Sequence, residues 1–252
     1  MGNISKQEKK DIIVLSVKKY RDRERLFVVE GEKSVSEFLD SSFKMRKVYY
    51  THECDFSDKH PCAIKISSAE MQQISNLKTI SPVLAVVEMP PVETEYVPHN
   101  DLILALDDIQ DPGNLGTIIR LADWFGINNI VCSLFTADAY GPKTVQATMG
   151  SLTRVRLVYT DLYPFLKAAS KESTIYGTFI EGENIYKAEL SRNGIIVMGN
   201  EGKGISPEIT GLVSRKLLIP AFAGNAAESL NVAVATAITC SEFRRRIIND
   251  DK

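Results

Sequence analysis

Long hydrophobic runs are missing from this sequence of 252 residues, since no apolar stretch approaches the roughly 18 residues that cross a bilayer. The first residues, MGNISKQEKKD, also lack the hydrophobic stretch of a signal peptide. Cysteine is scarce, because Cys54, Cys62, Cys132 and Cys240 are few and scattered, which does not suit a disulfide framework. These absences predict a protein of the cytoplasm that makes no membrane contact.

An excess of positive charge is missing as well, because 30 Lys and Arg face 32 Asp and Glu and leave a net charge of -2. The whole molecule therefore lacks the basic signature of a general nucleic-acid binder. Basic residues gather in two places, however. The first 25 residues hold eight Lys or Arg against four Asp or Glu, and Arg244, Arg245 and Arg246 lie near the C-terminus. These groups could contact phosphates, or they could form the solvated faces of terminal helices.

A stretch with three prolines, residues 89–100, divides the chain. Proline fits neither a helix interior nor a strand ladder, so this stretch is expected to be a linker. The sequence predicts a small α/β domain over residues 1–90, a linker over 91–100 and a second domain over 101–252. In the first domain, hydrophobic patterning predicts strands at 27–30, 47–50 and 83–87 and a helix at 33–39.

The second domain begins at residue 101 and opens with LILALDD, residues 102–108, a nearly continuous apolar run. Such a run is typical of a strand that is covered on both faces in a parallel sheet. Similar runs recur with helical patterns between most of them, which predicts a mostly parallel α/β sheet. The further strands are expected within residues 127–133, 154–160, 173–179, 194–200 and 216–222.

The first motif that could carry chemistry is DDIQDPGNLGTIIRLADWFG, residues 107–126. A strand ends in carboxylates, a turn follows, and a helix opens near Asn114, with Arg120 less than two helical turns further on. Ligands bind at the carboxyl ends of strands in open α/β sheets, and helix N-termini present free N–H groups, so a site is plausible here. Alternatively, Asn114 caps the helix and Arg120 lies on its solvated face.

The second motif is GIIVMGNEGKGIS, residues 194–206, in which an apolar strand leads into a loop with glycines at 199, 202 and 204. Glycine permits backbone shapes and close ligand approach that a side chain would block. The glycines match neither nucleotide-binding fingerprint, because Ile205 follows Gly204 where a Walker loop needs Lys, and the G-x-G-x-x-G spacing is absent. A turn with left-handed glycines explains the composition equally well.

The third motif is LLIPAFAGNAAESLNVAVATAITCSEF, residues 217–243, where Ser229 and Asn231 precede a long apolar helical stretch. Helix capping would account for Ser229, whereas Asn231 needs a hydrogen-bonding partner if it is buried.

Four residues between the strands of the first domain, His52, Cys54, His60 and Cys62, form an H-x-C, H-x-C pattern. Its spacing matches no familiar structural zinc site, so we expect no bound metal.

Taken together, the three motifs resemble the signature motifs of the SpoU-type RNA 2′-O-ribose methyltransferases of the SPOUT superfamily. The resemblance lies in the ordered combination of N-L-G-T-I-I-R, then G-N-E-G-K-G-I-S, then I-P-A-F-A-G ending in E-S-L-N-V. The segment KKYRDRERLFVVEGEKSVSEFL also resembles the substrate-binding domain that precedes the catalytic domain in the ribosomal-RNA branch. The resemblance therefore covers nearly the whole chain.

This resemblance implies a C-terminal α/β domain with a deep trefoil knot, which is otherwise very rare in proteins. It also implies a homodimer, an RNA substrate bound in part by the N-terminal domain, and S-adenosylmethionine as methyl donor. The residues that match the family's donor-binding positions are Gly199, Ile219 and Leu230. The residues that match its catalytic positions are Asn114, Arg120, Glu201, Ser229 and Asn231.

The chemistry of ribose methylation requires that the 2′-hydroxyl lose its proton and align with the donor methyl. The family proposal makes Arg120 the base, but a guanidinium normally stays charged. We therefore expect Arg120 to grip the target phosphate and to stabilise the developing alkoxide. Glu201 would orient Arg120, and Ser229 and Asn231 would position the ribose or the motif loops.

Two segments depart from common family versions. The loop AFAGNAAE is longer than in some relatives, and TVQATMGSL, residues 144–152, fits the family's serine-and-glycine turn only loosely. The appended domain favours ribosomal RNA as the substrate. A transfer-RNA 2′-O-methyltransferase is the alternative within the enzyme class, and a catalytically silent RNA-binding assembly factor is the alternative outside it.

Overall fold

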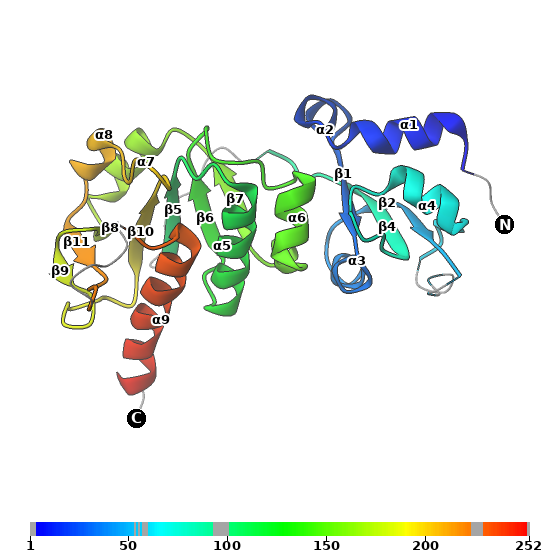
Figure 1. The fold of residues 1–252 in the computed structure, drawn as a ribbon. Helices are drawn as coiled ribbons and strands as arrows, with labels where there is room; N and C mark the ends of the chain where they lie inside the picture. Colours follow the sequence, from blue (N-terminus) through cyan, green and yellow to red (C-terminus); the bar gives the residue numbers. More distant parts are fainter. Residues whose placement is uncertain are drawn as a thin grey trace. The chain divides into compact units, whose positions relative to one another are not determined.

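The computed structural model describes residues 4–52, 54, 56, 60–92, 101–222 and 229–250, and side chains as far as residue 246. The chain divides into two compact units (Figure 1). The first comprises Met1–Pro91 together with Asp138–Thr153, and the second comprises Val92–Ala137 and Arg154–Lys252. Within the described ranges, no helix is both long enough and apolar enough to cross a membrane.

The first unit is built on a four-stranded sheet in the order β1-β4-β2-β3. Central strand β4 pairs antiparallel with β1 and with β2, whereas β3 joins β2 in parallel. The strands are β1 (Leu26–Glu30), β2 (Met45–Tyr50), β3 (Ala63–Lys65) and β4 (Val83–Glu88), and the helices are α1 (Lys6–Val14), α2 (Lys18–Glu24), α3 (Glu32–Leu39) and α4 (Ser68–Ile74). The predicted strands and the predicted helix of this region are thus confirmed to within two residues.

Local sequence explains where two of these helices begin. Ser5 caps α1 and Ser67 caps α4, and in both cases the carboxylate of the glutamate three residues on accepts a hydrogen bond from the backbone N–H of the serine. Such capping boxes satisfy N–H groups that a helix start would otherwise leave unpaired.

The segment Asp138–Thr153 belongs to the first unit, although the sequence analysis had assigned it to the second domain. It forms α6 (Pro142–Thr148) and the short 3₁₀ helix η1 (Ser151–Thr153). Helix α6 packs on β1, and the ring of Tyr140 lies 5.0 Å from that of Phe27 between centroids. Burial of apolar and aromatic surface therefore joins this segment to residues that precede it by more than a hundred positions.

A buried ion pair fixes the same contact. The Arg21 side chain, on α2, is 4% exposed, and its Nη2 lies 2.6 Å from Oδ2 of Asp138. Its Nε donates to the same carboxylate oxygen at 3.2 Å, and its Nη1 donates to the carbonyl of Leu15 at 2.7 Å. The guanidinium therefore has partners for all three of its nitrogens, which compensates for its removal from water.

The second unit holds a seven-stranded sheet in the order β7-β6-β5-β10-β8-β11-β9, and every recorded pairing in it is parallel. The predicted mostly parallel α/β sheet is confirmed, whereas the trefoil knot stays a prediction. The strands are β5 (Leu102–Asp107), β6 (Asn129–Cys132), β7 (Arg156–Tyr159), β8 (Ile175–Phe179), β9 (Glu183–Asn184), β10 (Gly194–Gly199) and β11 (Arg215–Leu218).

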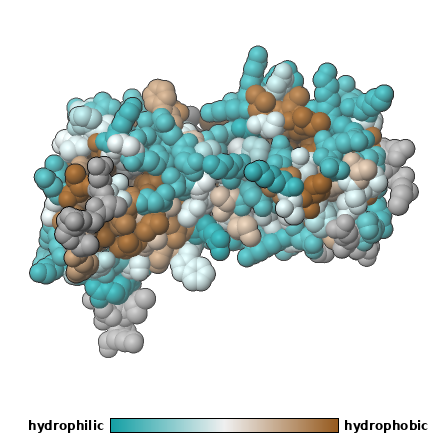
Figure 2. Space-filling view, in the orientation of Figure 1, coloured by the Kyte–Doolittle hydropathy of each residue, from teal (hydrophilic) through white to brown (hydrophobic). Residues whose placement is uncertain are grey.

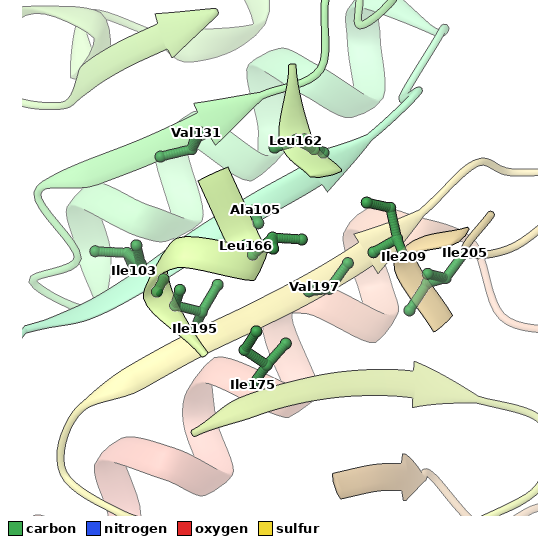
Figure 3. Packing of buried hydrophobic residues seen from close by; sticks show 11 residues of the cluster. Ile103, Ala105, Val131, Leu162, Leu166, Ile175, Ile195, Val197, Ile205 and Ile209 are labelled. Carbon is green, nitrogen blue, oxygen red and sulfur yellow. The ribbon is translucent and has the colours of Figure 1, made fainter. Parts of the chain in front are cut away.

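Both faces of this sheet are covered. Alternate residues of β5 and β10 point toward α7 (Leu162–Ala169) and α8 (Pro207–Thr210), where they form one apolar cluster with Leu166 and Ile209 (Figure 3). Helices α5 (Pro112–Trp124) and α9 (Val232–Asp250) pack against each other on the opposite face (Figure 1). Because both faces are buried, β10 and the first five residues of β5 are apolar instead of alternating.

The Arg21–Asp138 pair generates a stability prediction. Replacing Arg21→Ala leaves the Asp138 carboxylate largely buried without its cation, which we expect to destabilise the first unit by about 3 kcal/mol. Hydrogen–deuterium exchange should rise in β1 and in residues 138–153 together. The matched control is Arg23→Ala on the same helix, because the Arg23 side chain is 65% exposed. Equal exchange in the two variants would contradict a structural role for the buried pair.

Candidate active site

The carboxyl ends of the two central strands lie side by side. The register pairs Asp107, the last residue of β5, with Gly199, the last residue of β10. Asp107 is 8% exposed, and its Oδ2 accepts a hydrogen bond of 2.7 Å from the backbone N–H of Ser206. The loops that follow β5 and β10 are thus tied together at the edge where open α/β sheets bind ligands.

The glycine loop after β10 is held in a tight shape. A Cβ atom on Gly199 would lie 2.2 Å from the backbone nitrogen of Ile205, so no other residue fits there without a shift of the backbone. Asn200 accepts hydrogen bonds of 3.0 Å from two backbone N–H groups within the loop and donates one of 2.8 Å to the carbonyl of Asp108. Gly204 has φ of +70°. The left-handed turn considered from the sequence therefore exists, and it also positions the side chain of Glu201.

Asn114 does not cap α5. Asp111 is the N-cap residue, and its side chain accepts a hydrogen bond of 2.9 Å from the backbone N–H of Asn114. The D-P pair at 111–112 is a helix-start signal that could have revealed this from the sequence. Because Asp111 serves as the cap, the Asn114 amide is available for other partners.

Asn114 brings the three motifs together. Its Nδ2 donates to Oε1 of Glu201 at 3.0 Å, and its Oδ1 accepts from Nδ2 of Asn231 at 3.0 Å. Glu201 belongs to the second motif and Asn231 to the third, so residues 87 and 117 positions from Asn114 converge on one side chain. Three of the five predicted catalytic residues are therefore in direct contact.

Glu201 is an acceptor of several hydrogen bonds. The loss of water around its carboxylate raises its pKa, but donation from the Asn114 side chain and from backbone N–H groups outweighs this effect and lowers the pKa below the usual range. The backbone donors include Gln110 at 3.3 Å and Asp111 at 3.1 Å. At neutral pH the group is therefore a carboxylate that orients donors, and it is not suited to be a general acid.

Asn231, and not Ser229, is the residue that caps α9. Asn231 starts α9, since its Oδ1 accepts from the backbone N–H of Ala233 at 2.9 Å and of Val234 at 3.3 Å. Its amide nitrogen remains to bind Asn114. Ser229 is exposed, and its hydroxyl has no hydrogen bond within the described part of the chain.

Arg120 is exposed on α5, six residues after Asn114. The described residues give it neither an ion pair nor a hydrogen bond, so Glu201 does not orient it as the sequence analysis had expected. An exposed guanidinium on the helix that carries Asn114 can bind an anionic ligand in bidentate fashion.

Two of the three residues predicted to bind the methyl donor lie at the carboxyl edge of the sheet. Gly199 ends β10 and Ile219 follows β11, so both lie at the carboxyl edge. Ile219 is half-buried and Leu230 is 49% exposed, which leaves aliphatic surface for an adenine ring. The hydroxyl of Ser206 is buried at this edge without a partner among the described residues. Residues 223–228 of the third-motif loop lie outside the described residues.

The H-x-C pattern of the first unit shows no ligand arrangement. His60 uses Nδ1 to accept the backbone N–H of Cys62 at 3.1 Å. Across the described ranges, no three His, Cys, Asp or Glu residues are grouped as metal ligands would be.

The parallel sheet and the network at its carboxyl edge define an α/β protein whose three signature loops meet around one asparagine. The chain belongs to the SpoU rRNA Methylase family, whose model matches residues 101–241. Residues 6–85 match the MRM3-like substrate binding domain.

Relatives of known name and structure agree with this membership. The chain is 31% identical to the 23S rRNA (guanosine(2553)-2′-O)-methyltransferase RlmP of Bacillus subtilis, over 94% of this chain and 96% of that protein. A putative RNA methyltransferase of the TrmH family from Porphyromonas gingivalis superposes with a TM-score of 0.87 at 38% identity, covering 97% of this chain and 100% of the other. An AdoMet-bound rRNA methyltransferase from Sinorhizobium meliloti gives 0.86 at 29% identity, with 98% and 97% covered.

The lowered pKa of Glu201 generates a pH prediction. A folded-state pKa below the unfolded value of about 4.3 means that the ionised form stabilises the fold above that pH and that this stability is lost as the pH falls through the folded value. Glu201→Gln should lower the thermal midpoint by a constant amount between pH 7 and 5.5. The difference from wild type should shrink only below about pH 4. Thermal unfolding at several pH values checks this, and a difference that already shrinks between pH 7 and 5.5 would contradict it.

Proposed function

We propose that this protein is an S-adenosylmethionine-dependent methyltransferase that methylates a ribose 2′-hydroxyl of ribosomal RNA. The observation that carries the proposal is the Glu201–Asn114–Asn231 network, together with Arg120, which is exposed on the same helix as Asn114 and has no partner among the described residues. S-adenosylmethionine, when bound, supplies a methyl group on a positively charged sulfur. Gly199, Ile219 and Leu230 would hold it, the glycine through its backbone and the other two through aliphatic contact with adenine.

Arg120 is assigned to the RNA. Because it is exposed and has no partner among the described residues, its planar fork is free to bind the phosphate of the target nucleotide. A positive charge held there also stabilises the alkoxide that develops as the 2′-hydroxyl passes its proton to solvent water. The exposed hydroxyl of Ser229 is available to the ribose.

The share of this chain that its relatives match favours ribosomal RNA over transfer RNA as the substrate. The relative RlmP, named for 23S rRNA, matches 94% of this chain and so includes the first unit. A tRNA (guanosine(18)-2′-O)-methyltransferase from Aquifex aeolicus, at 31% identity, matches only 59% of it. A silent assembly factor is disfavoured because the network and the free guanidinium are both present, and RNA binding alone does not require this arrangement.

The protein is proposed to act as a homodimer in the cytoplasm. Apolar side chains gather over α9 (Figure 2), where Val234 is 49% exposed and Ile238 is half-buried. Exposed apolar patches of this kind mark interaction sites. Sedimentation should give about twice the chain mass of 28.0 kDa. The cytoplasm keeps free cysteines such as the buried Cys132 and Cys240 reduced.

The role of Arg120 generates a kinetic prediction. Arg120→Ala should abolish methyl transfer and leave donor affinity within about twofold, because the guanidinium serves the RNA and not the donor. Arg120→Lys should also fail, since a point charge does not reproduce the planar fork. Transfer of tritiated methyl groups to undermethylated ribosomal RNA and calorimetry with S-adenosylmethionine are the two measurements.

The matched control is Lys171→Ala, which removes an exposed cation from the turn before β8, at the opposite edge of the sheet. Normal turnover is expected for this variant. Turnover close to wild type in either Arg120 variant would remove Arg120 from the mechanism.

The first unit is proposed to bind RNA through exposed cations of α2. Lys18, Lys19 and Arg23 are exposed, whereas Arg21 is buried against Asp138 and cannot reach a phosphate. For single strands, the slope of log affinity against log salt changes by roughly 0.7 per phosphate contact. Replacing the three exposed residues with Gln should therefore lower the slope by up to about two units. Filter binding at several salt concentrations measures it, and an unchanged slope with unchanged affinity would show that these cations are only solvated.

A further inference from the structure

A short turn after β6 carries two large apolar side chains into solvent. The backbone N–H of Thr136 donates to the carbonyl of Ser133 at 3.1 Å, which closes a β-turn with Leu134 and Phe135 at its centre. Leu134 is 60% exposed and Phe135 is 80% exposed. Neither side chain contributes to the core.

Hydrogen bonds fix the turn to the residues at the carboxyl end of β5. The backbone N–H of Ser133 donates to the carbonyl of Leu106 at 2.9 Å, and the hydroxyl of Thr136 donates to the same carbonyl at 3.2 Å. The hydroxyl of Ser133 accepts from the backbone N–H of Asp108 at 2.9 Å. Thr136 is 4% exposed, so one end of the turn is buried. Phe135 therefore sits on a rigid base.

The residues at the centre of the turn are unusual for such a position. Gly, Pro, Asn, Asp and Ser normally occupy turns because they suit the backbone and tolerate water. Leu and Phe are not among the residues that suit the backbone of a turn. At this position their apolar side chains also stay in contact with water, which is unfavourable. We therefore expect the two side chains to contact a partner that is not part of the described core.

The place of the turn points to the substrate. It follows the carboxyl end of β6, next to β5, and it binds Asp108, which is two residues from Gln110. The backbone N–H of Gln110 donates to Glu201 of the active-site network. The turn is thus continuous with the edge of the sheet at which methyl transfer is proposed to occur.

We propose that Phe135, with Leu134 beside it, is a stacking platform for an unpaired base of the RNA near the methylated nucleotide. This inference rests on the proposed function. A protein partner of ordinary size buries about 800 Å² on each side, which two turn residues do not supply. One exposed ring on a rigid base matches the face of a single nucleobase, and stacking on aromatic side chains is a common way of holding unpaired RNA bases.

The test measures RNA binding and methyl transfer separately in the full-length protein. The RNA is ribosomal RNA from cells that lack the protein, and binding is measured without methyl donor. Phe135→Ala should weaken RNA affinity roughly 5- to 100-fold, with the same salt slope, because stacking neutralises no phosphate. Affinity for S-adenosylmethionine should not change.

Two further variants separate stacking from general apolar contact. Phe135→Tyr should stay within about threefold of wild type, whereas Phe135→Leu should lose most of the affinity because it keeps an apolar side chain without a ring. Trp124→Ala is the matched control, since it removes an equally exposed aromatic ring, 83% exposed, from the other end of α5.

The outcomes keep the two proposals distinct. If the wild-type protein binds ribosomal RNA but transfers no methyl group, the proposed function fails while the Phe135 variants still test stacking through binding. Unchanged RNA affinity in Phe135→Ala, or full affinity in Phe135→Leu, would overturn the stacking platform. A changed sedimentation coefficient with unchanged RNA affinity would also overturn it and assign the turn to contact with a second copy of the chain.

Discussion

The arrangement of the active site depends on the two hydrogen bonds of the Asn114 side chain. Glu201 is a carboxylate and can only accept, so it must face the amide nitrogen of Asn114. Asn231 has committed its oxygen to the start of α9, so it can only donate to the Asn114 oxygen. An amide is uncharged and offers a donor and an acceptor on two separate atoms, which explains why asparagine suits this position.

Asn114 is free to make these two hydrogen bonds because other residues cap the starts of α5 and α9. At α5, Asp111 satisfies the backbone and leaves the whole amide of Asn114 free. At α9, Asn231 satisfies the backbone with one half of its amide and binds Asn114 with the other. The helix packing that places α5 against α9 therefore also sets the distance between the motifs. Fold and site are consequently stabilised by the same contacts.

The sequence was sufficient to predict the helices and strands. It was insufficient to predict contacts between residues that lie far apart in the chain. The buried strands were predictable because runs such as LILAL are apolar throughout, and the site residues were identified by resemblance. The strand expected within 216–222 ends at Leu218, because Pro220 cannot continue a ladder. The buried pair of Arg21 with Asp138 was not predictable, since a basic residue in a charged segment is normally solvated and its partner lies 117 positions away.

The inclusion of Asp138–Thr153 in the first unit changes how the two units are connected. The chain passes between them three times, after Pro91, after Ala137 and after Thr153. A protease that cuts once between Pro91 and Asp101 therefore produces two fragments, and the C-terminal fragment still carries α6 of the first unit. The first unit is thus made of residues from both sides of that cut. A gene fusion or domain exchange at this boundary would therefore move only part of the first unit into another protein.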